Sequence, residues 1–263
     1  MTRTPKKSPD EMTFLEHLED LRKRLVWSLA SVFIAIIPAF MFAKPIYAFL
    51  SKPLTQNLPE GIKLVYTGIT EPFMLYMKVA FVAALFAVCP FIFYQIWKFV
   101  APGLYQKEKK YVWPFVFFTS VFFFGGAAFG YYVAFPFACK FFLNLGSDFS
   151  PMITVETFFG VTLKVLLGIG LVFEMPTLIF FLAKMGIVTS RWMVKNFKYA
   201  ILGVFIIAAV ITPTPDMINQ TLIAVPMLAL YTLSIGVAFF FGKETKTRKA
   251  KKAAAKGESG QAG

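Results

Sequence analysis

The chain has 263 residues, of which 57% are hydrophobic, 18% aromatic and only 16% charged, with a mean hydropathy of +0.65. A soluble domain is nearer one quarter charged, and here the apolar residues form long blocks, which excludes an ordinary soluble fold and predicts an all-α, polytopic membrane protein. In a soluble protein, the net charge of +13 would suggest a nucleic acid as the binding partner. Beside membrane spans it is mainly a signal for topology and for lipid headgroups, so we expect the lipid bilayer and no nucleic acid as a partner.

The first predicted element is an amphipathic helix at the end of residues 1–24. Thr13 and Glu16 form a capping box, so a helix should begin near Phe14. Apolar residues then recur at helical spacing on one face, at Phe14, Leu18, Leu21 and Leu25. We expect this helix to lie at the membrane interface and then to turn into the first span.

Carboxylates stand among the basic residues of this helix. Asp20 and Arg24 are four residues apart, as are Glu19 and Lys23, and each pair would stabilise a helix by about 0.2–0.5 kcal/mol. Acidic residues contribute little to membrane orientation, so the second interpretation is that they receive a cationic ligand. His17, the only histidine, lies in no catalytic arrangement and is interpreted as a surface residue of the helix.

Six apolar blocks predict six transmembrane helices, at residues 25–43, 73–97, 111–135, 157–183, 199–211 and 221–241. The fifth block would rise only about 20 Å, so it must borrow flanking residues or lie where the bilayer thins. Prolines interrupt five of the six blocks, which predicts kinked helices in a concave bundle; they are Pro38, Pro90, Pro114, Pro176 and Pro226.

The distribution of Lys and Arg predicts the orientation. Residues 1–24, the tail 242–263 and the two loops on the same side carry 21 basic residues, whereas the alternate loops carry 4. This places both termini in the cytoplasm, with residues 25–241 as the membrane domain and 242–263 as a basic, disordered tail. Lys78 and Lys164 lie near the outer ends of their spans, where we expect them to extend to the headgroups.

Two further carboxylates lie outside the N-terminal helix. Glu108 is the only one between residues 72 and 147, and is either a solvated loop residue or is held by the turn at Pro102. Glu174 is the one acidic residue inside a span, where a carboxylate costs at least about 2.5 kcal/mol at the bilayer centre, so we expect it to face a polar partner or cavity. An ion or small-solute transporter that uses Glu174 and Lys164 is therefore the alternative function.

No Walker loop, zinc motif or nucleophile elbow occurs in the chain, so we expect no enzyme, no cofactor and no metal. Several motifs in chain order instead resemble the TatC family, the polytopic subunit of the bacterial twin-arginine translocase. They are HLEDLRKRL before the first span, TEPF at 70–73, YQIWKFVAPGLYQKEKK at 94–110, FEMP at 173–176, and TPTPD with Gln220 before the last span. The resemblance covers roughly residues 13–242.

The resemblance implies a receptor for signal peptides with two adjacent arginines, which exports folded precursor proteins across the bacterial inner membrane with the proton-motive force. It implies that Asp20 and Glu108 accept the arginines, in a site shaped by Arg22, Arg24, Phe99, Pro102 and Leu104. Guanidinium matches carboxylate bidentately, which lysine cannot do. The family usually has Glu where this chain has Asp20, so the contact is weaker, water-mediated or shared with Glu19.

The resemblance also implies partners within the membrane. Single-span TatA- and TatB-like proteins would dock beside Glu174 and Gln220, and the chain would associate with further copies of itself in a larger complex.

Overall fold

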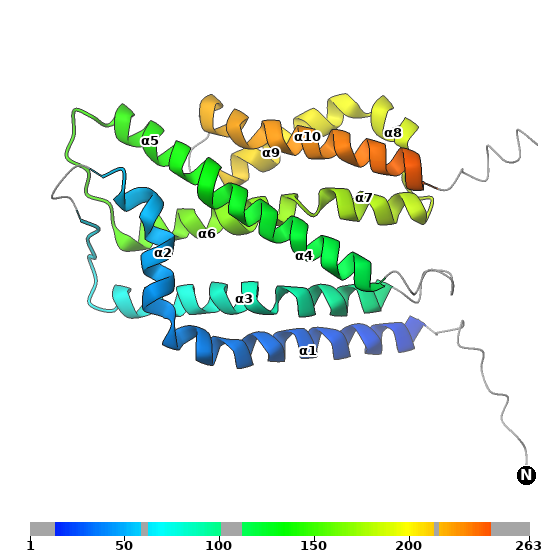
Figure 1. The fold of residues 1–263 in the computed structure, drawn as a ribbon, viewed down its shortest axis with the longest axis horizontal. Coiled ribbons are helices and arrows are strands. Elements are labelled where there is room, and N and C mark those ends of the chain that lie inside the picture. Colours follow the sequence, from blue (N-terminus) through cyan, green and yellow to red (C-terminus); the bar gives the residue numbers. More distant parts are fainter. Residues whose placement is uncertain (1–13, 59–62, 101–111, 213–215, 243–263) are drawn as a thin grey trace, which may run out of the picture. The chain divides into compact units, whose positions relative to one another are not determined.

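The computed structural model describes residues 14–58, 63–100, 112–212 and 216–242, which are almost entirely helical (Figure 1). The predicted all-α fold is confirmed. The helices are α1 (Phe14–Met41), α2 (Ala43–Thr55), α3 (Glu71–Val100), α4 (Val112–Phe129), the π turn η3 (Gly130–Ala134), α5 (Phe135–Leu145), α6 (Val155–Val172), α7 (Met175–Lys184), α8 (Ser190–Lys195), α9 (Phe197–Ile211) and α10 (Met217–Phe241).

Five stretches of the described chain are helical, long and apolar enough to cross a membrane: Glu16–Met41, Glu71–Phe99, Trp113–Leu145, Val155–Lys184 and Met217–Phe241. The fifth predicted block corresponds to α9, which is apolar but has only 15 residues and so rises about 22 Å. Its shortness agrees with the sequence, while the six-span arrangement stays a prediction.

Helix α1 differs from expectation, because the amphipathic segment and the first span form one continuous helix. The predicted turn between them is wrong. Good helix formers fill residues 18–25, and no helix-breaking residue precedes Pro38, which the helix accommodates. The described part of the helix starts at Phe14, and Thr13 lies outside the described residues, so the capping box stays a prediction.

Residues 101–111, which precede α4, lie outside the described chain, so the interruption of a span at Pro114 stays a prediction. One other expectation about the spans needs correction. The third span does not end at residue 135, since η3 continues the helix into α5 as far as Leu145.

Helix α2 (Ala43–Thr55) forms the first part of the connection between the first two predicted spans, residues 44–72, which was expected to be a loop. It is too short and too polar to register as a span, yet one of its faces is apolar. Ala43, Leu50 and Leu54 recur at helical spacing on that face and are buried, although the helix also contains Pro53.

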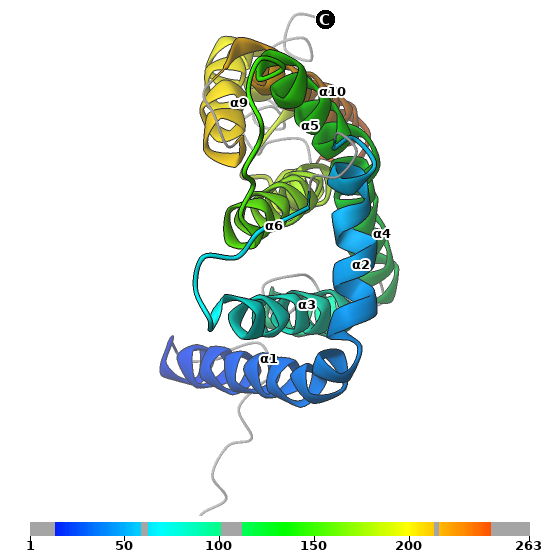
Figure 2. The same ribbon diagram turned by 90° about the vertical axis from the view of Figure 1, so that its left-hand side faces the viewer.

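The chain folds as two compact units, and the first comprises Met1–Val121 with Cys139–Leu163. Within it, α1 lies along α3 (Figure 1), and α2 leaves the end of α1 and runs past α3 at a steep angle (Figure 2). Val79 and Phe159 are fully buried in this unit. The ring of Tyr47 on α2 stacks on Phe159 of α6, with centroids 5.2 Å apart.

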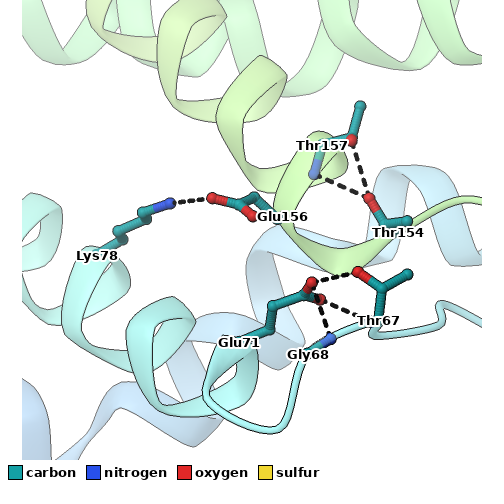
Figure 3. A network of polar contacts seen from close by, with 7 residues as sticks. All are labelled: Thr67, Gly68, Glu71, Lys78, Thr154, Glu156 and Thr157. Carbon is teal, nitrogen blue, oxygen red and sulfur yellow. Dashed lines mark hydrogen bonds and ion pairs between the residues drawn. The ribbon is translucent and has the colours of Figure 1, made fainter.

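A polar network closes one end of the first unit (Figure 3). Glu71, the acidic residue of the TEPF motif, accepts hydrogen bonds from the backbone N–H groups of Thr67, at 3.0 Å, and Gly68, at 3.1 Å, and from the Thr67 hydroxyl. Glu71 therefore holds the chain that enters α3. The neighbouring segments 63–66 and 151–155 are joined by a backbone bridge between Val65 and Thr154.

The same network contains an ion pair that the sequence did not reveal. Lys78 Nζ on α3 lies 2.9 Å from Glu156 Oε1 on α6 (Figure 3). Lys78 is thus paired with a carboxylate 78 positions away, and because the two side chains are 49% and 62% exposed, its extension to the headgroups stays a prediction. Linear patterns do not show pairs at such separations.

The second unit comprises Phe122–Ala138 with Lys164–Gly263, and in it α10 packs against α7, α8 and α9. Two glycines allow close approach. A Cβ added at Gly126 would lie 2.7 Å from Phe173 Cγ, and one added at Gly168 would lie 2.8 Å from Ile211 Cγ1. These contacts bring the end of α6 against α4 and the end of α9 against α6.

Candidate functional site

The acidic helix α1 turns one face toward α3. His17, Asp20 and Arg24 are spaced by three and four residues, and all three are half-buried, whereas Glu19 and Arg22 are exposed. Arg24 Nε lies 2.7 Å from Asp20 Oδ2, and the two side chains are only 15% and 19% exposed. The predicted Asp20–Arg24 pair is thus formed, and Asp20 keeps its second oxygen, Oδ1, for another donor.

The other predicted helix pair is not formed, because Glu19 and Lys23 are both exposed and make no ion pair with each other within the described chain. Their charges face solvent or headgroups. Glu19 is therefore accessible to a ligand, although it lies off the face of α1 that carries Asp20.

The ring of His17 stacks on Phe99 near the end of α3, with centroids 4.3 Å apart and planes 15° apart. His17 is therefore a packed residue of the α1–α3 contact, rather than the simple surface residue expected. The structure brings Phe99 to the helix face that carries Asp20. The spacing of His17 relative to Asp20 and Arg24 was the sequence signal that could have placed His17 on this face of α1.

Three residues of the predicted site, Glu108, Pro102 and Leu104, lie outside the described residues. Their place in the site stays a prediction.

In the second unit, Glu174 lies at the break between α6 and α7. Pro176 has no N–H to donate to the carbonyl of residue 172, so the helix is interrupted there and restarts at Met175. Glu174 is 7% exposed, and Thr177 and the backbone of Phe123 lie within hydrogen-bonding reach of its carboxyl. Its Oε1 has no partner among the described residues. The span carboxylate is therefore buried in protein, with one oxygen still able to accept a hydrogen bond.

Gln220 and Lys164 behave differently from Glu174. The Gln220 side chain donates from Nε2 to the backbone oxygen of Phe205, at 2.8 Å, and so joins α10 to α9. Lys164 is exposed. No hydrogen bond or ion pair links either residue to Glu174 in the described chain.

Comparison with known proteins identifies the family. Residues 16–226 match the model of the Sec-independent protein translocase protein TatC. A relative from Koribacter versatilis, named Sec-independent protein translocase protein TatC, is 46% identical over 241 residues, covering 90% of this chain and 89% of its own. A relative of the same name from Desulforapulum autotrophicum is 41% identical and covers 93% of this chain and 89% of its own.

The fold agrees with solved structures as well. A crystal structure described as twin arginine translocase receptor TatC in DDM matches with a TM-score of 0.77 and 35% identity, covering 87% of this chain and 100% of the other. A second crystal structure of that receptor matches with a TM-score of 0.75 and 34% identity, covering 85% and 98%. With its apolar spanning helices, the chain is a multi-pass membrane protein that belongs to the TatC family.

Proposed function

We propose that this chain is the signal-peptide receptor and core subunit of a twin-arginine translocase, which exports folded proteins with the proton-motive force. One observation within the chain carries the proposal: a half-buried carboxylate, Asp20, lies on the α1 face that also carries the His17–Phe99 stack. Two solved structures that this chain resembles are described as the twin arginine translocase receptor, which supports the same role.

The chemistry of the proposed site favours arginine over lysine. One guanidinium would donate to Asp20 and the other to Glu108, with Arg22, Arg24, Phe99, Pro102 and Leu104 shaping the site and the exposed Glu19 close by in sequence. A guanidinium presents a planar fork that matches two acceptor oxygens, whereas an ammonium does not.

Two such contacts do not account for tight binding. A hydrogen bond to a charged group contributes about 1.5–3 kcal/mol, whereas micromolar affinity requires about 8 kcal/mol. The apolar stretch of the signal peptide must therefore supply much of the affinity by burial. The arginines set specificity.

The membrane partners are part of the same proposal. A Tat complex requires further components, and the buried Glu174, whose Oε1 has no partner among the described residues, would accept a hydrogen bond from a polar side chain of a TatA- or TatB-like helix, with Gln220 as a second residue of the proposed docking region. Self-association belongs to this proposal too. The bacterial relatives and the excess of basic residues support a bacterial inner-membrane location with both termini in the cytoplasm.

The two alternatives have less support. The reported relatives and structures are translocase proteins, so the comparisons do not support a small-solute transporter using Glu174 and Lys164. Membership of a family of translocase subunits agrees with the absence of catalytic motifs, and the chain is not an enzyme.

Site-specific photocrosslinking tests the proposal. A twin-arginine signal peptide with a photoreactive residue beside the arginines is presented to the purified chain and to the Asp20→Asn/Glu108→Gln variant. We expect crosslinks to α1 that require both the arginines and the two carboxylates.

A twin-lysine peptide and the variant Asp148→Asn serve as controls, because the latter removes an exposed carboxylate at a distant position in the chain. Equal labelling of all combinations would show that Asp20 and Glu108 are not the arginine acceptors.

A further inference from the structure

We propose that α8 and the start of α9 form a binding surface for anionic phospholipid headgroups. We name this the α8 surface, and it consists of Arg191, Trp192, Val194, Lys195, Lys198 and Tyr199. The proposal rests on the chain being a membrane protein and is independent of signal-peptide binding.

The α8 surface stands on a fixed base. Met193 is fully buried in a cluster with Ala183 and Ala238, and its backbone oxygen accepts a hydrogen bond from the Tyr231 hydroxyl, at 3.1 Å. Thr189 caps the start of α8, accepting from the backbone N–H of Trp192 at 3.3 Å. The helix is thus held by α7 and α10, and its remaining side chains point away from the core.

Those outward side chains include apolar groups of the kind that lie at membrane interfaces. Trp192 and Val194 are each 59% exposed, and Tyr199 is 62% exposed. Trp and Tyr are enriched at the level of lipid headgroups, where an apolar ring and a polar tip are both satisfied. On a surface that faces only water, the apolar parts of these rings would stay exposed and would not be stabilised in this way.

The cations of the α8 surface have no counterion among the residues that the structure describes. Arg191, Lys195 and Lys198 are exposed and form no ion pair with any residue in the part of the chain that the structure describes. The sequence has no acidic residue from 175 to 215. Lys198 Nζ lies 5.0 Å from the centroid of the Tyr199 ring, so one cation is already directed over an aromatic group. An external anion is required to balance this charge.

Chain connectivity fixes the depth of this surface. It lies between the end of the spanning stretch Val155–Lys184 and the apolar helix α9, so it cannot move far from the membrane boundary. The phosphodiester of a lipid headgroup is the anion always within reach at that level. The acyl chains of the same lipid lie beside the exposed Trp192 and Val194. Lipid thereby satisfies both the charge and the apolar groups, whereas an acidic soluble protein would satisfy only the charge.

Quenching of tryptophan fluorescence by brominated lipids tests the proposal. The chain is reconstituted in phosphatidylcholine vesicles with increasing phosphatidylglycerol, one of the two lipids being brominated, and the Trp192 signal is the difference between the chain and Trp192→Phe. We expect phosphatidylglycerol to be preferred at Trp192. In Arg191→Gln/Lys195→Gln/Lys198→Gln that preference should fall about tenfold or more.

The variant Lys44→Gln/Lys52→Gln/Lys63→Gln is the matched control, because it removes three exposed cations from another part of the chain and should leave the preference unchanged. Equal quenching by the two lipids in the unmodified chain, or an unchanged preference in the α8 variant, would overturn the proposal. So would loss of the preference on adding inorganic phosphate or a polyglutamate peptide, since either would identify a different occupant.

Discussion

At the level of single residues, Asp20 is already engaged before any ligand arrives. Arg24 Nε lies 2.7 Å from Oδ2, in a contact only 15–19% exposed. An incoming guanidinium that binds both carboxylate oxygens would share Oδ2 with Arg24, and one that binds Oδ1 alone loses the bidentate geometry that distinguishes arginine from lysine. In the proposed site, Arg24 would therefore compete with the signal arginine for Asp20.

Replacing Arg24 tests this competition. We expect Arg24→Gln to increase the affinity for a twin-arginine peptide about twofold to fivefold, the size of a partly exposed ion pair, measured by fluorescence anisotropy with a labelled peptide. Lys23→Gln is the control, because Lys23 is exposed and unpaired with Glu19. An affinity that falls in Arg24→Gln but not in the control would mean that Arg24 positions Asp20 instead.

The stack of His17 on Phe99 gives a second prediction at this level. Removing the ring in His17→Ala should lower stability by about 0.5–1.5 kcal/mol and weaken peptide binding, because the α1 face that carries Asp20 loses one of its contacts with α3. His17→Phe should restore both, as measured by thermal unfolding in detergent and by anisotropy. Failure of His17→Phe to restore either would exclude ring stacking as the cause.

At the level of elements, two glycines in α6 have opposite surroundings. A Cβ at Gly168 would lie 2.8 Å from Ile211 Cγ1, whereas one at Gly160 would have no atom within 4 Å. We expect Gly168→Ala to destabilise the protein by about 1–3 kcal/mol through overpacking against α9. Gly160→Ala, in the same helix, should be neutral or stabilising by up to about 1 kcal/mol. Melting temperatures that fall equally in both variants would refute this difference.

The elements also show what the sequence could and could not predict. Hydropathy located the spanning stretches, because it is a local property of the sequence. Helix α2 was missed because it has only 13 residues and only one of its faces is apolar, so it forms no long apolar block in the sequence. The break at Glu174 depends on Pro176, whereas Pro38 is tolerated, and only tertiary packing distinguishes the two.

The candidate site was predictable to a similar extent. The i,i+4 spacing predicted the Asp20–Arg24 pair, but the same spacing predicted a Glu19–Lys23 pair that does not form. The difference is that only Asp20 and Arg24 lie on the half-buried face. Contacts across many residues, such as His17 with Phe99, require the fold.

At the level of the whole molecule, the topology depends on the 15-residue helix α9. If it crosses the membrane, Ile187 before it and Met217 after it lie on opposite sides; both are exposed. In a chain with Cys89→Ala and Cys139→Ala, we expect Ile187→Cys, which lies before α9 and outside the α8 surface, to react with an impermeant maleimide only from the inside and Met217→Cys only from the outside. Labelling of both from the same side would mean that α9 does not span and that the termini lie on opposite sides.

The packing of α10 against α7 has a consequence for biogenesis. Ribosomal synthesis proceeds from the N-terminus, so α7 enters the membrane before the helix that covers it exists. Phe180 and Ala183 lack their neighbours Phe241 and Ala238 until α10 is made. A nascent chain that stalls before residue 241 therefore leaves α7 without the complete helix α10 that packs against it in the folded protein. The second unit is completed only by the last helix to be made.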